Sequence, residues 1–145
     1  MCPDESPPSV EFNVRRGAVA VIFEQGRLLV IRRAAGVAAP GKICFPGGAI
    51  EPGESEEQAV ERELAEELRL QVRPVRRLWE CVTPWKVHLA WWLTERIDDA
   101  EPDPHPAEVA EVFWFAPDQL AGHTDLLTSN GEFLAAVKRG EIRLD

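Results

Sequence analysis

The spacing of apolar and polar residues along this 145-residue chain predicts a strand-rich fold. Short apolar, β-branched runs at 17–23 and 27–33 flank a turn at 24–26, which is typical of a hairpin. In a later run Val87 and Leu89 alternate with more polar neighbours, and this period of two indicates a strand. Strands are expected over residues 17–23, 27–33, 75–83, 86–95 and 111–116.

A different period marks the helices. Val60, Leu64 and Leu68 recur every four residues and form one apolar stripe, and Ser55 just before them is a favoured N-cap residue. A short helix at 117–122 and a terminal helix at 130–140 complete the pattern. The fold class is therefore α/β (α+β), built on a mixed sheet.

Composition places these elements in one domain. Hydrophobic residues make up 45% of the chain, with five Trp and six Phe, which excludes a disordered protein. Residues 1–12 are rich in Pro, Ser and acidic side chains, and we expect a flexible tail there. The single domain is expected over 13–145, since no internal repeat is present.

Charge and cysteine content narrow the class of partners. A net charge of −9 and a pI near 4.9 argue against duplex nucleic acid as a partner. Three scattered cysteines form neither a disulfide framework nor a zinc pattern, so a reducing cytoplasm is expected. No stretch is long and apolar enough for a membrane span.

Eight glutamates lie between Glu51 and Glu67. At 100° per residue, Glu67 and Glu66 fall about 40° and 60° to either side of Glu63, beside the apolar stripe. Ionised carboxylates so placed repel one another, and a hard divalent cation such as Mg²⁺ or Mn²⁺ would relieve the repulsion. The alternative is a solvated helix face, the ordinary environment of glutamate-rich helices.

The spacing of these residues resembles the Nudix box, GX5EX7REUXEEXGU. Six fixed positions and both apolar "U" positions match: Gly48, Glu54, Arg62, Glu63, Glu66, Glu67, Leu64 and Leu70. Arg69 replaces the last glycine of the box, which puts the geometry of the helix end in question and leaves the carboxylates in place. The resemblance to MutT-type Nudix hydrolases is firm over 28–70 and extends over roughly 17–137. It implies a mixed β-sheet sandwiched between helices.

The resemblance also implies roles for the box residues. Glu66 and Glu67 resemble metal ligands, with the Gly47 carbonyl as a further ligand, and Glu63 resembles either a ligand or the general base. Arg62 and Glu54 resemble the pair that orients the catalytic carboxylates. The implied cofactor is Mg²⁺ or Mn²⁺.

Outside the box the resemblance suggests further residues, each with a plainer alternative. Glu108 resembles a distal metal-binding acid, with Glu111 as its rival and a solvated loop acid as the alternative. Arg33 resembles a phosphate-contacting arginine, or else it is an exposed residue at a strand end. Asn130 resembles a base-reading side chain, or else it caps the last helix. Trp85 or Trp92 would stack a base, whereas Trp91 fits the core.

The implied activity is metal-dependent hydrolysis of a nucleoside diphosphate linked to another group. The substrate expected first is a damaged or surplus (deoxy)nucleoside triphosphate. Hydrolysis of a nucleoside-diphosphate sugar or ADP-ribose, and a nucleotide-sensing module without catalysis, remain open alternatives. The partner is a small-molecule nucleotide, and a homodimer is an option that the sequence does not decide.

Overall fold

A computed structural model describes residues 15–145, so the expected flexible tail over 1–12 lies outside the described residues. The elements in chain order are β1 (Arg15–Val21), β2 (Phe23–Glu24), β3 (Arg27–Arg33), β4 (Ile43–Cys44), β5 (Gly47–Ala49), α1 (Glu56–Leu68), β6 (Val72–Val82), β7 (Val87–Arg96), β8 (Val109–Phe115), α2 (Pro117–Ala121) and α3 (Thr128–Lys138). The expected α/β (α+β) class is confirmed.

The strands form two sheets. The first has the order β5-β1-β7-β6, in which β1 runs parallel to β7 and antiparallel to β5. In the second, β3 pairs with β2, β4 and β8, all antiparallel. The mixed sheet expected from the sequence is therefore present, and the parallel β1–β7 pair joins segments about half the chain apart.

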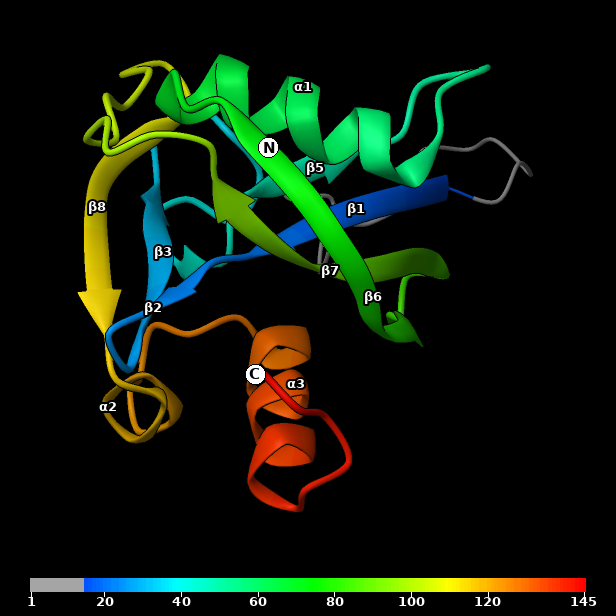
Figure 1. The fold of residues 1–145 in the computed structure, drawn as a ribbon, viewed down its shortest axis with the longest axis vertical. Coiled ribbons are helices and arrows are strands. Elements are labelled where there is room, and N and C mark those ends of the chain that lie inside the picture. Colours follow the sequence, from blue (N-terminus) through cyan, green and yellow to red (C-terminus); the bar gives the residue numbers. More distant parts are fainter. Residues whose placement is uncertain (1–14) are drawn as a thin grey trace.

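Helices α1 and α3 lie on opposite sides of the strands (Figure 1). Alternate residues of β1 point to the two sides. Ala18 and Ala20 share a buried cluster with Leu64 of α1, whereas Val19 and Val21 share a second cluster with the aromatic residues below the sheet. Two cores therefore fix α1 and α3 independently on the two faces of β1.

The hairpin expected from residues 17–33 is only partly correct. Its turn is as predicted, but the partner of β3 in that hairpin is the two-residue β2, through Phe23 and Glu24. The chain turns out of β1 at Ile22, and β1 pairs instead with β5 and β7. Because residues 18–22 are fully or almost fully buried, β1 needs a sheet neighbour on each side, and these come from later in the chain.

Helix α1 begins where the sequence predicts. The Ser55 hydroxyl accepts a hydrogen bond from the Gln58 amide at 3.0 Å, and the Gln58 side chain accepts one from the Ser55 amide at 2.9 Å. This reciprocal capping box satisfies two backbone donors at the helix start. Val60, Leu64 and Leu68 are fully buried, which confirms the apolar stripe.

Helix α3 begins two residues earlier than expected, and its N-cap residue is Leu127. The alternative interpretation of Asn130 as the N-cap is therefore wrong. Phe133 of this helix stacks on Trp91 with ring centres 4.5 Å apart, so Trp91 is a core residue, as expected.

None of the helices among residues 15–145 is both long and apolar enough to cross a membrane.

Candidate active site on helix α1

Strand β5, which precedes α1 in the chain, packs tightly against β1. A Cβ atom on Gly47 would lie 2.2 Å from the Ala18 carbonyl oxygen, and Gly47 has a φ of 154°. Only glycine therefore permits β5 to pair here with β1. The glycine places its own backbone beside the start of the loop that carries Glu51 and Glu54.

Arg62 connects that loop to the helix carboxylates. Its Nε and Nη2 donate to the two Glu54 carboxylate oxygens at 2.8 and 3.0 Å, and Nη2 also donates to the Ala49 carbonyl at 2.9 Å. Its Nη1 donates to Glu63 at 2.8 Å and to Glu66 at 3.2 Å. The guanidinium is thus fully engaged in orienting three box carboxylates, and the contact with Glu54 is bidentate.

The pKa values of this pair shift in the expected directions. Hydrogen bonding to Arg62 holds the pKa of the Glu54 carboxyl below its ordinary value, against the opposing effect of burial. The same contact raises the pKa of the Arg62 guanidinium. Both groups therefore stay ionised at neutral pH, and the ion pair is permanent under ordinary conditions.

The three box carboxylates on α1, those of Glu63, Glu66 and Glu67, are not equally exposed. Glu63 and Glu67 are buried, with 6% and 0% of their surface accessible, whereas half of the Glu66 side chain is exposed. Burial raises the pKa of Glu63, but hydrogen bonds with Glu67 and Arg62 help to lower it, and its net shift is downward. Glu63 and Glu67 are therefore a pair of buried carboxylates, and Glu66 lies outside this pair.

The loop before β8 is attached to the C-terminal end of α1. In the sequence EPDPHP, prolines at 102, 104 and 106 lack N–H groups, so Asp103 and His105 supply the backbone donors. The Asp103 amide donates to the Leu68 carbonyl and the His105 amide to the Glu67 carbonyl, both at 2.8 Å. These bonds satisfy carbonyls that a helix end otherwise leaves without partners.

Glu108 and Glu111 follow this loop but differ in their surroundings. The Glu108 amide donates to the His105 carbonyl at 3.0 Å, and its Oε2 is buried without a hydrogen-bond partner among the described residues. Glu111 instead accepts from Arg32 Nε at 3.0 Å on β3 and is half exposed. The geometry therefore favours Glu108 over Glu111 as the distal acid of the site.

The donor set suits a hard divalent cation. Glu63, Glu67 and Glu108 offer carboxylate oxygens, the ligands that Mg²⁺ and Mn²⁺ prefer, and the burial of the Glu108 oxygen would be offset by such an ion. Among residues 15–145, however, no three His, Cys, Asp or Glu side chains are already grouped in a way that could hold a metal ion. The residues therefore fit a cation in chemistry and burial, without a preformed cluster.

The two polar residues assigned to the substrate are both buried. Arg33 has 2% of its surface accessible, and its Nε donates to the Ala38 carbonyl at 2.6 Å, so the interpretation as an exposed strand-end arginine is wrong. Asn130 is equally buried, and its Oδ1 accepts from the Phe45 amide at 2.9 Å. This bond ties α3 to the segment that leads into Gly47. Their contacts with a nucleotide remain predictions.

The two candidate stacking tryptophans differ in their surroundings. Trp85 is 41% exposed in the turn between β6 and β7. Trp92 lies under the first turn of α1, where its Nε1 donates to Glu56 at 2.9 Å. The sequence predicted either residue as a base platform, and only Trp85 presents a large exposed ring surface.

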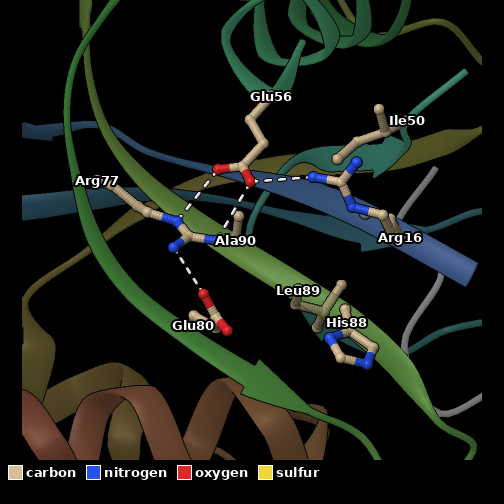
Figure 2. A pocket seen from close by; sticks show the side chains of 9 residues that line it. Arg16, Ile50, Glu56, Arg77, Glu80, His88, Leu89 and Ala90 are labelled. Carbon is tan, nitrogen blue, oxygen red and sulfur yellow. Dashed lines mark hydrogen bonds and ion pairs between the residues drawn. The ribbon is translucent and has the colours of Figure 1, made fainter. Parts of the chain in front are cut away.

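Glu56 lies at the other end of α1 from the carboxylate pair and borders a cavity of about 180 Å³ (Figure 2). It contacts Arg16 at 3.2 Å and Arg77 at 3.1 Å, and Arg77 also pairs with Glu80 at 2.6 Å. The charged side chains that line this cavity are thus paired with one another. They join the start of α1 to β1 and β6.

Sequence reasoning did not identify Asp103 and His105 as part of the site. Their contribution is a backbone N–H, which carries no side-chain signal. The alternating prolines in 101–106 are the one feature of the sequence that marks them.

The fold places a helix with the box carboxylates against one face of the mixed sheet. Comparison with protein-family profiles matches residues 13–137 to the NUDIX domain, so the chain belongs to this family. It is 30% identical, over 72% of its length, to an NAD-capped RNA hydrolase of Chromobacterium violaceum, of which the match spans only 39%. It is 51% identical to the 8-oxo-dGTP diphosphatase of Escherichia coli over 35% of this chain and 40% of that protein.

A solved structure of the MutT protein from Methanosarcina mazei shows the same fold. Its TM-score is 0.77 at 23% identity, covering 91% of this chain and 98% of that one. At this identity the similarity supports the architecture, including the mixed sheet between helices that the sequence predicted.

Proposed function

We propose that this protein is a divalent-metal-dependent pyrophosphohydrolase that cleaves a phosphoric anhydride bond in a nucleoside diphosphate derivative, with (deoxy)nucleoside triphosphates as the first substrates. The observation that carries the proposal is the buried Glu63–Glu67 pair beside the loop that bears Glu108. Buried carboxylates at this density favour a site for a cation with a polyphosphate. The name of the Escherichia coli relative supports a triphosphate substrate.

Each residue of the candidate site has a role in this proposal. Glu63, Glu66, Glu67, Glu108 and the Gly47 carbonyl would hold Mg²⁺ or Mn²⁺. When bound, such an ion supplies charge neutralisation at the diphosphate and a lower pKa for attacking water. Glu63 would serve either as a ligand or as the general base that accepts the proton of that water, and it lies buried beside Glu67. Arg62 and Glu54 keep these carboxylates oriented through the hydrogen bonds described above.

The substrate is tested with a panel incubated with Mg²⁺ or Mn²⁺. The panel contains dGTP, 8-oxo-dGTP, ATP, ADP-ribose and a UDP-sugar, and ³¹P NMR identifies the phosphorus products. We expect the triphosphates to release pyrophosphate or phosphate. Faster turnover of ADP-ribose or the UDP-sugar would replace the proposed substrate, whereas thermal stabilisation by one nucleotide without any turnover would identify a sensing module.

A further inference from the structure

The residue that follows helix α1, Arg69, adopts a backbone conformation that L side chains disfavour. Arg69 has φ 53° and ψ 34°, the left-handed region in which L side chains are strained. The Arg69 N–H donates to the Ala65 carbonyl at 3.0 Å, the single bond of an αL helix ending, and the Leu70 N–H donates to the Leu64 carbonyl at 3.2 Å. The helix end therefore keeps the geometry that a glycine would give, although an arginine occupies the position.

The Arg69 side chain reaches the loop that leads to Glu108. Its Nη1 lies 3.5 Å from Asp103 Oδ2. Asp103 is also the residue whose amide donates to the Leu68 carbonyl, two residues before the His105 amide donates to the Glu67 carbonyl. A backbone bond and an ion pair thus hold the same loop residue against the end of the helix.

We propose that Arg69 is a positioning residue: its ion pair with Asp103 fixes the loop that carries Glu108 against the helix end that carries Glu67. The inference rests on the proposed function, because it assigns the Glu108 loop to the metal site. Arg69 touches neither the metal nor the substrate in this proposal. It acts through Asp103, and then through the turn in which Glu108 N–H donates to the His105 carbonyl.

Replacement by glycine separates this role from a purely structural one. Glycine adopts the left-handed conformation freely, so Arg69→Gly removes the ion pair while it relaxes the helix end. We expect an unchanged or higher melting temperature together with Mn²⁺ binding that is about two- to five-fold weaker, the range for an exposed ion pair. If Arg69 served stability alone, its replacement would not weaken Mn²⁺ binding while the melting temperature stayed the same or rose.

Three matched variants complete the test, with Mn²⁺ affinity measured by electron paramagnetic resonance. Asp103→Asn should weaken binding as much as Arg69→Gly, and the double variant should be no weaker than either single one. Arg69→Lys, which keeps the charge, should bind as the wild type does. Unchanged affinity in Arg69→Gly, or additive losses in the double variant, would overturn the proposal.

Hydrogen exchange at the Asp103 and His105 amides tests the same inference without metal. Both amides should exchange about two- to five-fold faster in Arg69→Gly than in the wild type. Unchanged exchange would overturn the positioning role whatever the enzyme hydrolyses. Faster exchange and weaker Mn²⁺ binding in a protein that turns over no nucleotide would instead refute only the proposed function.

Discussion

The two ends of helix α1 differ in how many cationic groups contact each carboxylate. At its start, the single carboxylate of Glu56 contacts two guanidinium groups, those of Arg16 and Arg77, and the indole N–H of Trp92. In its second half the ratio is reversed. There Arg62 alone contacts four carboxylates, at 2.8–3.7 Å: Glu51, Glu54, Glu63 and Glu66.

The difference shows how a glutamate-rich sequence can contain both a structural and a functional region. At the start of the helix the guanidinium groups of Arg16 and Arg77 balance the carboxylates of Glu56 and Glu80, and these ion pairs tie α1 to the sheet. Around Arg62 negative charge is concentrated, and part of it is buried. Carboxylates concentrated in this way repel one another, and a bound cation would reduce that repulsion.

The largest effect is expected at the buried pair. Glu67→Gln keeps the shape of the side chain and removes its charge, so turnover of the best panel substrate should fall on the order of 10²–10⁴-fold. The circular dichroism spectrum should stay that of the wild type. Glu61→Gln, on the exposed side of the same helix, is the matched control and should retain full activity. Near-normal rates in Glu67→Gln would remove this residue from the site.

Arg62 is expected to have the next largest effect. Arg62→Lys keeps one positive charge but loses the fork that binds Glu54 and Glu63 together. Activity should fall about 10- to 100-fold, the range for residues that orient metal ligands. Steady-state kinetics with saturating Mg²⁺ measure it. A lysine variant with wild-type kcat/KM would show that charge alone, without bidentate geometry, is sufficient.

At the other end of the helix the effect should fall on stability. Glu56→Gln removes the charge that Arg16 and Arg77 share, and the free energy of unfolding should drop by about 1–2 kcal/mol. Urea denaturation measures the loss, and kcat should be unchanged below the transition. A large loss of kcat in the folded variant would contradict the division of the helix into two regions.

The smallest effect is a pH dependence of stability at Glu54. Arg62 holds the folded-state pKa of Glu54 below its ordinary value of 4.5, so this contribution is complete above that value and is lost as the pH falls through the lower folded-state pKa. The wild type should therefore exceed Glu54→Gln in unfolding free energy by about 1 kcal/mol near neutral pH, and the gap should close in acid. A gap that is independent of pH would contradict the ion-pair assignment.

The sequence predicted α1 well because its signals are local. Ser55 and Gln58 stand three residues apart, and Val60, Leu64 and Leu68 define the buried stripe, so both the start and the orientation of the helix follow from neighbouring residues. The sequence predicted that Glu63, Glu66 and Glu67 share one helix face; Glu63 and Glu67 are buried there, whereas Glu66 is half exposed. At 100° per residue Glu67 lies about 60° from Leu64 around the helix axis and Glu66 about 160°, so the same apolar stripe accounts for the difference in their burial.

Long-range partners explain the remaining errors. The turn at 24–26 was predicted correctly, but nothing local reveals that β1 pairs in parallel with β7 about 70 residues later. Arg33 resembles a surface residue in sequence and is buried by the loop whose Ala38 carbonyl it binds. Asn130 resembles a helix cap and instead binds Phe45, which lies 85 positions earlier in the chain.

Mn²⁺ titration of three proteins tests the central claim most directly: the wild type, Glu67→Gln and Glu56→Gln, followed by electron paramagnetic resonance. The account predicts saturable binding in the wild type, the same affinity in Glu56→Gln, and an affinity reduced by at least about ten-fold in Glu67→Gln. Equal binding by all three proteins, or a loss confined to Glu56→Gln, would contradict the assignment of a cation site to the second half of α1.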